Sequence, residues 1–372
     1  MPSRNKIPGW FIKKYLLVLF AGLTAFLVSA GCASDKNSVP DFKNTVSAAK
    51  ILFLNFKTQA PGGRGRPFEE TGRTTKAGTN YDLYEPKEKV RKTVVVVTGL
   101  TLLGAKDPRF LNFCRSLAQA EIRAAAFDPA GFKSAKFEEQ DYDALKDLVK
   151  SLAGEYKGKL GIIAFSVGGG MALAVAADPE VSSLIDPVIL FSTYYNLEEL
   201  LDSIKKKCSA PPAADASEIA WDDYIWFLMI GAYRDPEAAG LDSSQKKELK
   251  EILESYCYLP IERKRGFYER ALKGKTGLGF ADTEADRAIY QKLSPAGKLA
   301  TVRARVIIFH DSSDTMISTD HSRKIFAELN EKRPGGEQSL LVTPLLSHVD
   351  ARATWRMFDF LRICKMMGEI YE

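Results

Sequence analysis

The stretch LGIIAFSVGGG, residues 160–170, places a single hydroxyl group at the end of an apolar run. Its first six residues have the length and composition of a buried β-strand. Ser166 follows, and three consecutive glycines begin two residues later. A strand that turns sharply into a helix needs little side-chain bulk around the turn, and Ala164 and Gly168 meet this need. The pattern predicts that Ser166 stands exposed between this strand and a helix at 168–177.

The three glycines also suit a phosphate-binding loop, but their spacing excludes that interpretation. A dinucleotide-binding fingerprint would need a glycine at position 173, where Leu173 stands. No Gly-Lys-Ser or Gly-Lys-Thr sequence follows nearby. We therefore interpret the glycines together with the serine that precedes them.

Around this stretch, short β-branched runs alternate with helical patterns. The predicted strands lie at 93–98, 122–127, 160–165, 187–191, 305–310 and 339–343. Such alternation is typical of βαβ units and predicts an α/β protein with a mainly parallel sheet covered on both faces. Between 194 and 294 only helical patterns occur. They lie at 196–207, 217–234 and 243–258 and predict a helical insertion.

A serine hydroxyl needs a base to act as a nucleophile near neutral pH, and the chain offers three histidines. His310 ends a predicted strand, and we interpret it as structural. His321 lies at the predicted start of a helix. His348 follows the last predicted strand and precedes a helical pattern at 351–364, so we expect it on a loop at the carboxyl edge of the sheet. His348 is the predicted base.

Together these residues resemble the α/β-hydrolase family, whose serine turn usually reads Gly-x-Ser-x-Gly. Here the turn reads AFSVG, with alanine in place of the first glycine. The segment HDSSDTMI, 310–317, is similar to the family's His-Gly-x-x-Asp-x-x-Val segment, which implies that Asp314 is the acid that orients the histidine. Asp311 replaces the usual glycine and is the first alternative. Serine, aspartate and histidine also follow one another in the order of the family.

The resemblance extends to the backbone groups that would stabilise an oxyanion. The first predicted strand runs into Thr98-Gly99-Leu100, where the family has His-Gly and then the residue that supplies one N–H group. The resemblance therefore assigns the two oxyanion N–H groups to Leu100 and Val167. Thr98 departs from the family's histidine, so the hydrogen bonds that shape this loop are expected to differ.

The resemblance covers residues 79–195 and 293–372. Further similar segments lie at 81–86, 128–134 and 293–295. It implies an α/β-hydrolase fold, with a mainly parallel central sheet flanked by helices and with 196–292 as a helical cap or lid. The cap carries an apolar stripe at 221–230, which indicates an acyl or aromatic substrate if it faces the site. Packing of the cap itself explains the stripe equally well.

The N-terminal segment is typical of a secretion signal. Four basic residues precede an apolar run at 16–28, which is shorter than the about 20 residues needed to span a bilayer. Small residues then lead to Cys32, and the segment resembles a bacterial lipoprotein signal with Cys32 as the acylated residue. Ser29 departs from the usual leucine, and an ordinary signal peptide or an uncleaved anchor is the alternative. Residues 1–31 are thus the predicted signal, and 32–78 a tether and flexible lead-in.

Charge and cysteine usage argue against a nucleic-acid partner and against a metal site. The 52 Lys and Arg exceed the 47 Asp and Glu by only five, and four of the basic residues lie in the predicted signal. A nearly neutral mature chain argues against a nucleic-acid partner. The cysteines after Cys32 show no CxxC spacing and no nearby histidine, which argues against a metal site. Cys208 and Cys257 could pair in an oxidising compartment, or remain buried thiols.

These observations predict a serine hydrolase, like a carboxylesterase or lipase, that cleaves a small-molecule or lipid ester through an acyl-enzyme without a cofactor. Its triad is Ser166, Asp314 and His348. A lipid on Cys32 would tether it to a membrane of the bacterial cell envelope, facing an extracytoplasmic compartment. Acyl transfer and amide hydrolysis use the same triad and remain open. A weak or inactive envelope lipoprotein that uses the fold as a binding module is the other alternative.

Overall fold

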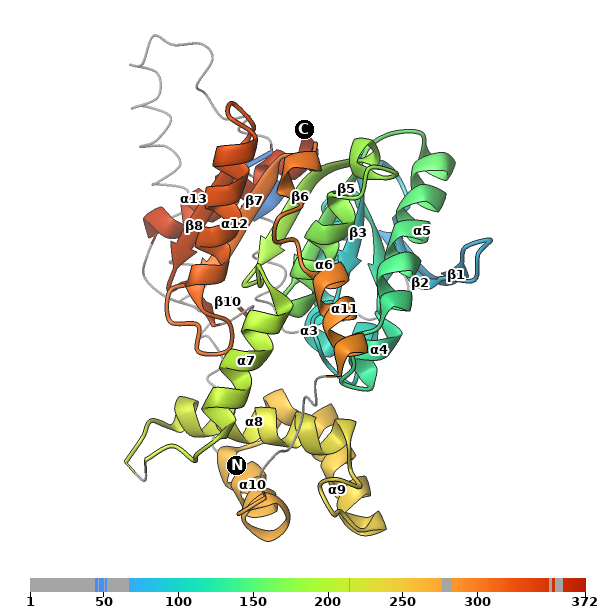
Figure 1. Cartoon of the computed structure of the whole chain (residues 1–372). Helices are drawn as coiled ribbons and strands as arrows, with labels where there is room; N and C mark the ends of the chain where they lie inside the picture. Colours follow the sequence, from blue (N-terminus) through green and yellow to red (C-terminus); the bar gives the residue numbers. More distant parts are fainter. Residues whose placement is uncertain are drawn as a thin grey trace.

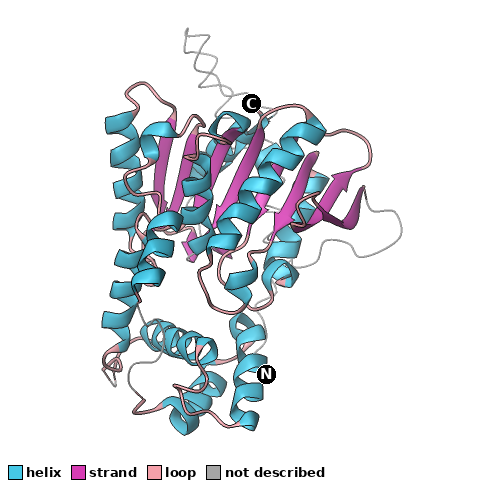
Figure 2. Ribbon diagram, turned by 45° about the vertical axis from the view of Figure 1, so that its right-hand side comes forward, coloured by secondary structure: helices cyan, strands magenta, loops and turns pink. Residues whose placement is uncertain are grey.

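The computed structural model describes residues 44–45, 47–49, 51, 67–213, 215–275, 283–347, 350–351 and 357–372. A central sheet stands between two layers of helices (Figure 2). A smaller helical layer lies below one end of the strands (Figure 1). The predicted cysteine anchor, Cys32, and the predicted base, His348, lie outside the described residues.

The sheet has eight strands in the order β1-β2-β4-β3-β5-β6-β7-β8. They are β1 (Phe68–Thr74), β2 (Asn80–Pro86), β3 (Lys92–Val97), β4 (Ile122–Phe127), β5 (Leu160–Phe165), β6 (Ile185–Phe191), β7 (Val306–Asp311) and β8 (Gln338–Thr343). β2 is antiparallel to both of its neighbours, and all other neighbouring strands are parallel. The mainly parallel sheet is therefore confirmed, and each predicted strand is present with its ends shifted by two residues or fewer.

The central strands are apolar because both of their faces are covered. Alternate residues of β3 point to opposite faces: Val95 and Val97 belong to one core cluster, and Val94 and Val96 to the other. The first cluster is completed by α5 (Glu139–Tyr156), α6 (Val167–Ala176) and α12 (Thr319–Lys332). The second is completed by α3 (Pro108–Gln119) and α13 (Met357–Gly368). A short helix, α4 (Ala130–Lys133), follows β4.

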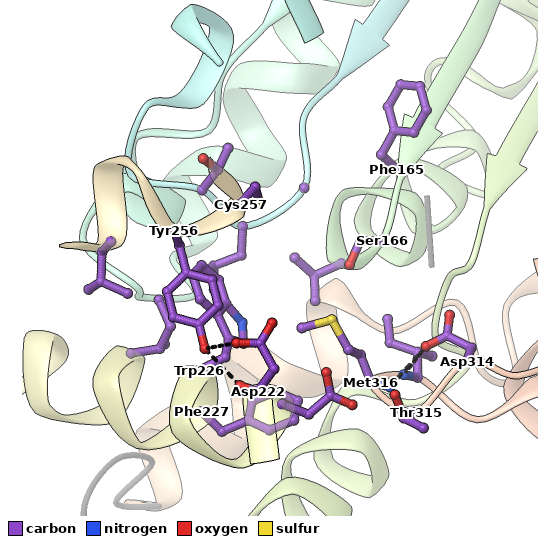
Figure 3. Close-up of a pocket in the computed structure, with 18 of the residues that line it drawn as sticks. Phe165, Ser166, Asp222, Trp226, Phe227, Tyr256, Cys257, Asp314, Thr315 and Met316 are labelled. Atoms are coloured by element: carbon purple, nitrogen blue, oxygen red, sulfur yellow. Dashed lines mark hydrogen bonds between the residues drawn. The ribbon is translucent and has the colours of Figure 1, made fainter. Parts of the chain in front are cut away.

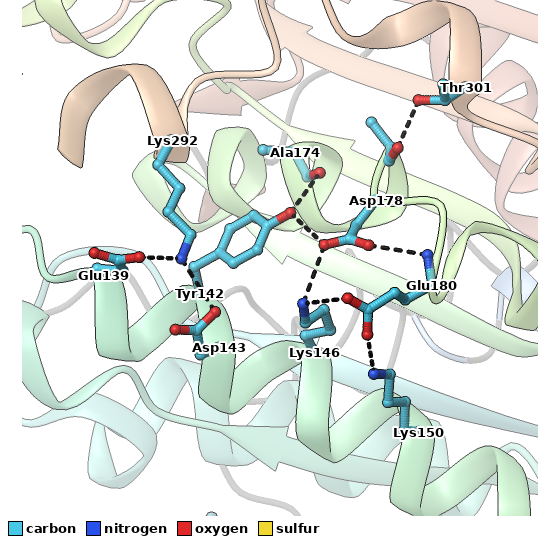
Figure 4. A network of polar contacts seen from close by, with 11 residues as sticks. Glu139, Tyr142, Asp143, Lys146, Lys150, Ala174, Asp178, Glu180, Lys292 and Thr301 are labelled. Carbon is cyan, nitrogen blue, oxygen red and sulfur yellow. Dashed lines mark hydrogen bonds and ion pairs between the residues drawn. The ribbon is translucent and has the colours of Figure 1, made fainter. Parts of the chain in front are cut away.

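Every described element between β6 and β7 is helical. These helices are α7 (Leu197–Cys208), α8 (Glu218–Arg234), α9 (Ser243–Glu254), α10 (Ile261–Phe267) and α11 (Glu284–Leu293), with short turns η3 (Tyr256–Tyr258) and η4 (Tyr268–Leu272). α7 leads away from the sheet, and α8, α9 and α10 form the lower layer of Figure 1. α11 returns to the sheet domain, where Lys292 forms ion pairs with Glu139 and Asp143 of α5 (Figure 4). At the other end, Glu199 of α7 forms an ion pair with Lys324 of α12, so the insertion is held to the sheet domain at both ends.

A polar network fixes the end of α6 against α5 (Figure 4). Asp178, just after α6, accepts hydrogen bonds from the Tyr142 hydroxyl at 3.0 Å and from Lys146 Nζ at 3.3 Å. Lys146 also reaches Glu180 at 3.2 Å. Because α6 begins directly after Ser166, this network helps to hold the helix that follows the serine turn.

The sheet begins earlier than the sequence indicated. β1 lies inside the segment 32–78 that was expected to be a flexible lead-in, and it pairs with β2 along its whole length. Phe68 is its one buried residue, and the other six residues are exposed. The strand therefore carries no apolar alternation, and its pairing depends on hydrogen bonds to β2 that no local pattern announces. Ala48 and Ile51 of the same segment are also fully buried.

The region around the predicted base also differs from expectation. The helix expected from position 351 is replaced there by β10 (Asp350–Ala351), which pairs with β9 (Leu346–Ser347). Described helix resumes at Met357. Ala351 pairs with Leu346 of β9, so strand pairing overrides the helical composition of 351–364 at its start.

The structure also bears on the expected disulfide and on membrane-spanning helices. In the described part of the chain, Cys208 and Cys257 are not joined by a disulfide. No helix among the residues that the structure describes is both long and apolar enough to cross a bilayer.

We predict that Gly168→Ala destabilises the fold. A Cβ atom at this position would lie 2.1 Å from the carbonyl oxygen of Thr98, which belongs to the backbone and cannot rotate away. We expect a loss of about 1–3 kcal/mol in the free energy of unfolding, measured by urea denaturation. Gly154→Ala is the matched control. An added Cβ there meets nothing within 4 Å, so in α5 the change should stabilise by about 0.5–1 kcal/mol. Equal effects of the two substitutions would contradict the close approach.

Candidate active site

Ser166 lies in the sharp turn between β5 and α6. Its backbone has φ 52° and ψ −128°, a left-handed conformation that a serine adopts only under constraint from its surroundings. Two hydrogen bonds hold it: its N–H donates to the carbonyl of Phe191 at 2.8 Å, and its carbonyl accepts from the N–H of Gly169 at 3.0 Å. The strained strand-to-helix turn anticipated from the sequence is therefore present.

The glycines after Ser166 allow α6 to lie directly on the neighbouring strand ends. An added Cβ at Gly169 would lie 2.5 Å from the Thr193 hydroxyl, and one at Gly170 would lie 2.3 Å from the Tyr194 ring. Both partners follow β6. The glycine run is thus explained by close packing and not by a bound phosphate.

A cavity of about 620 Å³ opens between the strand ends and the cap. Its lining includes four residues that the sequence assigned to the site: Ser166, Asp314, Leu100 and Val167. Figure 3 shows Ser166 and Asp314 on one side of the cavity and labelled cap residues on the other. The lining also includes a large set of apolar side chains: Phe110, Phe113, Phe137, Leu200, Leu201, Ile204, Trp226, Phe227, Ile230 and Leu253.

Asp314 lies on the loop that follows β7, and its side chain is fully buried. Its Oδ1 accepts the backbone N–H groups of Met316 and Ile317, both at 2.9 Å. These two bonds fix the carboxylate with respect to the cavity. Asp311, the alternative acid, is also buried and lines the same cavity; its Oδ1 accepts the N–H and the hydroxyl of Ser313, both at 3.0 Å.

Both ring nitrogens of His310 have partners in the interior. Nδ1 lies 2.6 Å from the Ser322 hydroxyl, and Nε2 lies 2.9 Å from the carbonyl of Ile317. Nε2 is also 3.5 Å from Asp314 Oδ2. The ring is fully buried and does not line the cavity. His310 therefore braces the loop that carries Asp314 against α12.

His321 has a backbone partner on the segment that follows β6. Its Nδ1 accepts the backbone N–H of Tyr195 at 3.2 Å, and burial lowers its pKa to about 4. It too is absent from the cavity lining. It connects the start of α12 to the segment that enters the cap.

The apolar stripe of the cap divides into two parts, so both interpretations of it apply. Trp226, Phe227 and Ile230 line the cavity. Trp221 and Tyr224 instead pack edge to face within the cap, with ring centroids 5.9 Å apart. Other residues of the stripe are buried inside the cap: Ile225, Leu228 and Met229.

The sequence analysis missed the polar residues of the cap that reach the cavity. Asp222 accepts hydrogen bonds from Lys264 Nζ at 2.8 Å and from the Tyr256 hydroxyl at 3.0 Å (Figure 3). Lys264 Nζ also lies 3.9 Å above the Tyr256 ring. The available signal was the pair of aspartates at 222–223, which interrupts an otherwise apolar stripe.

No metal-binding arrangement occurs in the described residues, where no three His, Cys, Asp or Glu side chains gather as a metal site requires. Thr98, which stands where the family has histidine, has a buried hydroxyl with no hydrogen-bond partner in the described part of the chain. The loop after β3 is therefore shaped by its backbone: the N–H of Thr98 donates to the carbonyl of Phe127 at 3.2 Å.

The strand order, with a serine turn after β5 and a buried aspartate after β7, is that of the α/β-hydrolase fold. No model of a known protein family matches the chain, and no curated protein matches it either. Similar solved structures include a hormone-sensitive lipase from a metagenome library (14% identity, 94% of this chain and 97% of that one, TM-score 0.48). Another is an esterase of Pyrococcus furiosus (13% identity, 83% of this chain and 95% of that one, TM-score 0.45). A third is 2-hydroxy-6-oxo-6-phenylhexa-2,4-dienoate hydrolase from Rhodococcus sp. strain RHA1 (17% identity, 74% of this chain and 91% of that one, TM-score 0.41). The fold assignment rests on the strand order of this chain.

We predict that His321 makes the fold less stable as the pH falls below 6.5. Its folded-state pKa is lowered, so the unfolded chain binds a proton that the folded chain refuses, and this penalty grows until the pH reaches about 4. Compared with His321→Asn, which retains an acceptor for the Tyr195 N–H, the parent should lose about 2 kcal/mol more between pH 7 and pH 5. Urea denaturation at both pH values measures this difference. Parallel pH profiles for the two chains would contradict the assignment.

Proposed function

We propose that the protein is a serine hydrolase of carboxylic esters, with Ser166 as nucleophile, His348 as base and Asp314 as orienting acid. The observation that carries the proposal is the strained backbone of Ser166 at the wall of a cavity that Asp314 shares. Strain of this kind persists only where the surrounding structure enforces it, and it concentrates at functional sites.

The assignment of the base is supported by elimination and by chain position. Both ring nitrogens of His310 and the Nδ1 of His321 have partners, and neither histidine lines the cavity. The third histidine, His348, falls between β9 and β10. β9 lies beside β7, and the loop that follows β7 carries Asp314. The place of His348 in the chain, directly after β9, supports its assignment as the base.

In the proposed mechanism, the hydroxyl oxygen of Ser166 attacks the ester carbonyl carbon while His348 takes the proton of that hydroxyl. The backbone N–H groups of Leu100 and Val167 stabilise the resulting oxyanion, and each such donor contributes about 3–4 kcal/mol. Collapse breaks the bond to the alcohol, which leaves with the proton from His348. Water then attacks the acyl-enzyme by the same steps and releases the acid.

Asp314 acts on the histidine and not on the ester. A buried carboxylate holds one imidazole tautomer and stabilises the imidazolium that forms at each attack. The N–H groups of Met316 and Ile317 hold one carboxylate oxygen of Asp314 in place. Both carboxylates line the cavity, and we favour Asp314 over Asp311 because Asp314 stands at the acid position of the family segment that 310–317 resembles.

We predict that a fluorophosphonate modifies Ser166 alone. The parent chain should gain one probe mass, and Ser166→Ala should gain none. His348→Ala should react more slowly by about 10³-fold or more, because the hydroxyl then keeps its proton. Intact-protein mass spectrometry over time measures the labelling of all three chains.

We also predict that the two aspartates differ in their effect on ester hydrolysis. With a p-nitrophenyl ester as substrate, Asp314→Asn should lower kcat by about 10⁴-fold, and Asp311→Asn should lower it far less.

Ser313→Ala is the matched control, since it removes a different hydroxyl from the same cavity. It should still be labelled. A labelled Ser166→Ala chain would mean that the nucleophile is another residue. A folded parent that takes up no probe would favour the binding-module alternative, and equal losses in the two aspartate variants would reject Asp314 as the acid.

We also propose that the mature chain is anchored by lipid on Cys32 and faces an extracytoplasmic compartment; the N-terminal segment is the support for this. Metabolic labelling with a fatty-acid analogue is expected to mark the parent and not Cys32→Ala. Cys208→Ala is the control and should be labelled like the parent. Equal labelling of Cys32→Ala and the parent would reject the anchor.

A further inference from the structure

The loop that carries Asp314 is held from the sheet domain at its base. Asp314 Oδ1 accepts the backbone N–H of Met316, two residues further on, which closes an Asx turn with Thr315 at its centre. The ring of His310 lies 2.9 Å from the carbonyl of Ile317, just beyond that turn. Figure 3 shows Asp314, Thr315 and Met316 together at one side of the cavity. The position of the carboxylate therefore depends on how the turn around Thr315 is held.

Thr315 itself is held from the cap. Its carbonyl accepts a hydrogen bond from Nζ of Lys207, near the end of α7. Its side chain hydrogen-bonds to the carboxylate of Asp223, in α8. Thr315 is an exposed residue of its loop, and both of these contacts reach it from the side of the cap. Two helices of the cap thus converge on the residue next to the proposed acid.

Lys207, Asp223 and Thr315 also support one another, and we call this group the Thr315 contact. Burial raises the pKa of the Asp223 carboxyl, and both the Thr315 side chain and the positive charge of Lys207 oppose this shift. A hydrogen bond with a charged donor or acceptor is stronger than one between neutral groups. The lysine and the aspartate therefore hold Thr315 more firmly than neutral side chains would.

The other connections between the cap and the sheet domain lie elsewhere. α8, which carries Asp223, has its main packing partners within the cap: α7, α9, α10 and η4. The ion pairs that tie α7 to α12 and α11 to α5 involve residues that are absent from the cavity lining. The Thr315 contact is therefore a direct connection between the cap and the turn that holds Asp314.

We infer that the cap positions the orienting acid: Lys207 and Asp223 hold Thr315 and, through it, the turn that fixes the carboxylate of Asp314. This inference rests on the proposed triad for the role of Asp314. Lys207 and Asp223 are positioning residues, because they act through Thr315 and take no part in the bond changes at the ester. A cap that moves away from the loop releases Thr315, so access to the cavity and the order of the triad are linked.

Two substitutions remove the two bonds to Thr315 separately. Thr315→Val replaces the hydroxyl with a methyl group and keeps the carbonyl that Lys207 contacts. Lys207→Met removes the ammonium group at a residue that does not line the cavity. Each should lower kcat for a p-nitrophenyl ester by about three- to tenfold and leave KM within about twofold, because a displaced acid affects the histidine and not substrate binding. Thr315→Ser retains the hydroxyl and should keep kcat within about twofold of the parent.

Lys206→Met and Ser312→Ala are the matched controls. Lys206 is an exposed neighbour of Lys207 on α7, and Ser312 is exposed on the same loop as Thr315. Both variants should keep the kinetic constants of the parent. Asp223→Ala tests the pairing with Thr315, because adding Thr315→Val to it should cause no further loss of kcat. Circular dichroism of each variant confirms that it is folded.

Hydrogen exchange tests the inference without any substrate. The N–H groups of Met316 and Ile317 both donate to Asp314 Oδ1, so their exchange rates report how firmly the turn is held. Mass spectrometry with residue-level fragmentation should find this exchange about three- to tenfold faster in Thr315→Val and Lys207→Met, and unchanged in the two controls.

The outcomes separate this inference from the esterase proposal. Exchange that stays at the parent rate in Thr315→Val and Lys207→Met would overturn the inference. So would an active parent whose kcat is unchanged by both substitutions, or losses of the same size in the controls. Faster exchange in the two variants of a parent that hydrolyses no ester would reject the esterase proposal and leave the hold of the cap on the loop standing.

Discussion

The close approach of α6 to the end of β3 is the constraint on which the site depends. The carbonyl of Thr98 lies where a Cβ of residue 168 would stand, so the helix can begin there only with glycine. With the helix held so near, the residue between β5 and α6 must adopt a left-handed backbone, and Ser166 does so. The same approach brings the loop after β3, which carries Leu100, beside the serine.

Parallel strands explain how distant residues reach one cavity. Their carboxyl ends lie at the same edge of the sheet, so the loops after β3, β5 and β7 meet there. The acid loop needs more support than the serine turn, because it is longer. His310 supplies that support from within the core by contacting both Ile317 and Ser322. A histidine at the end of a strand thus serves the site without entering it.

In the cap, α8 both packs against its neighbouring helices and lines the cavity. Part of α8 packs inside the cap, and another part closes the cavity over Ser166 with apolar side chains. Between them, Asp222 is fixed by Lys264 and Tyr256, whereas the neighbouring Asp223 retains an oxygen without a partner among the described residues.

The sequence by itself determined the features that depend on local pattern. The apolar runs of β3 and β5 predicted central strands, small residues around Ser166 predicted a tight turn, and the absence of strand patterns between β6 and β7 predicted the helical insertion. Each follows from periodicity or bulk within a few residues. The fold class followed from their alternation.

Only the tertiary structure decided what depends on partners far along the chain. β1 is almost entirely polar, and it is a strand because β2 offers it hydrogen bonds. The hydrogen-bond partners of the histidines also come from distant segments: Ser322 and Ile317 contact His310, and the N–H of Tyr195 donates to His321. The division of the apolar stripe and the state of Asp223 likewise depend on what packs against α8. Neither hydrogen-bond satisfaction nor burial can be read from a single segment, because both are properties of the folded neighbourhood.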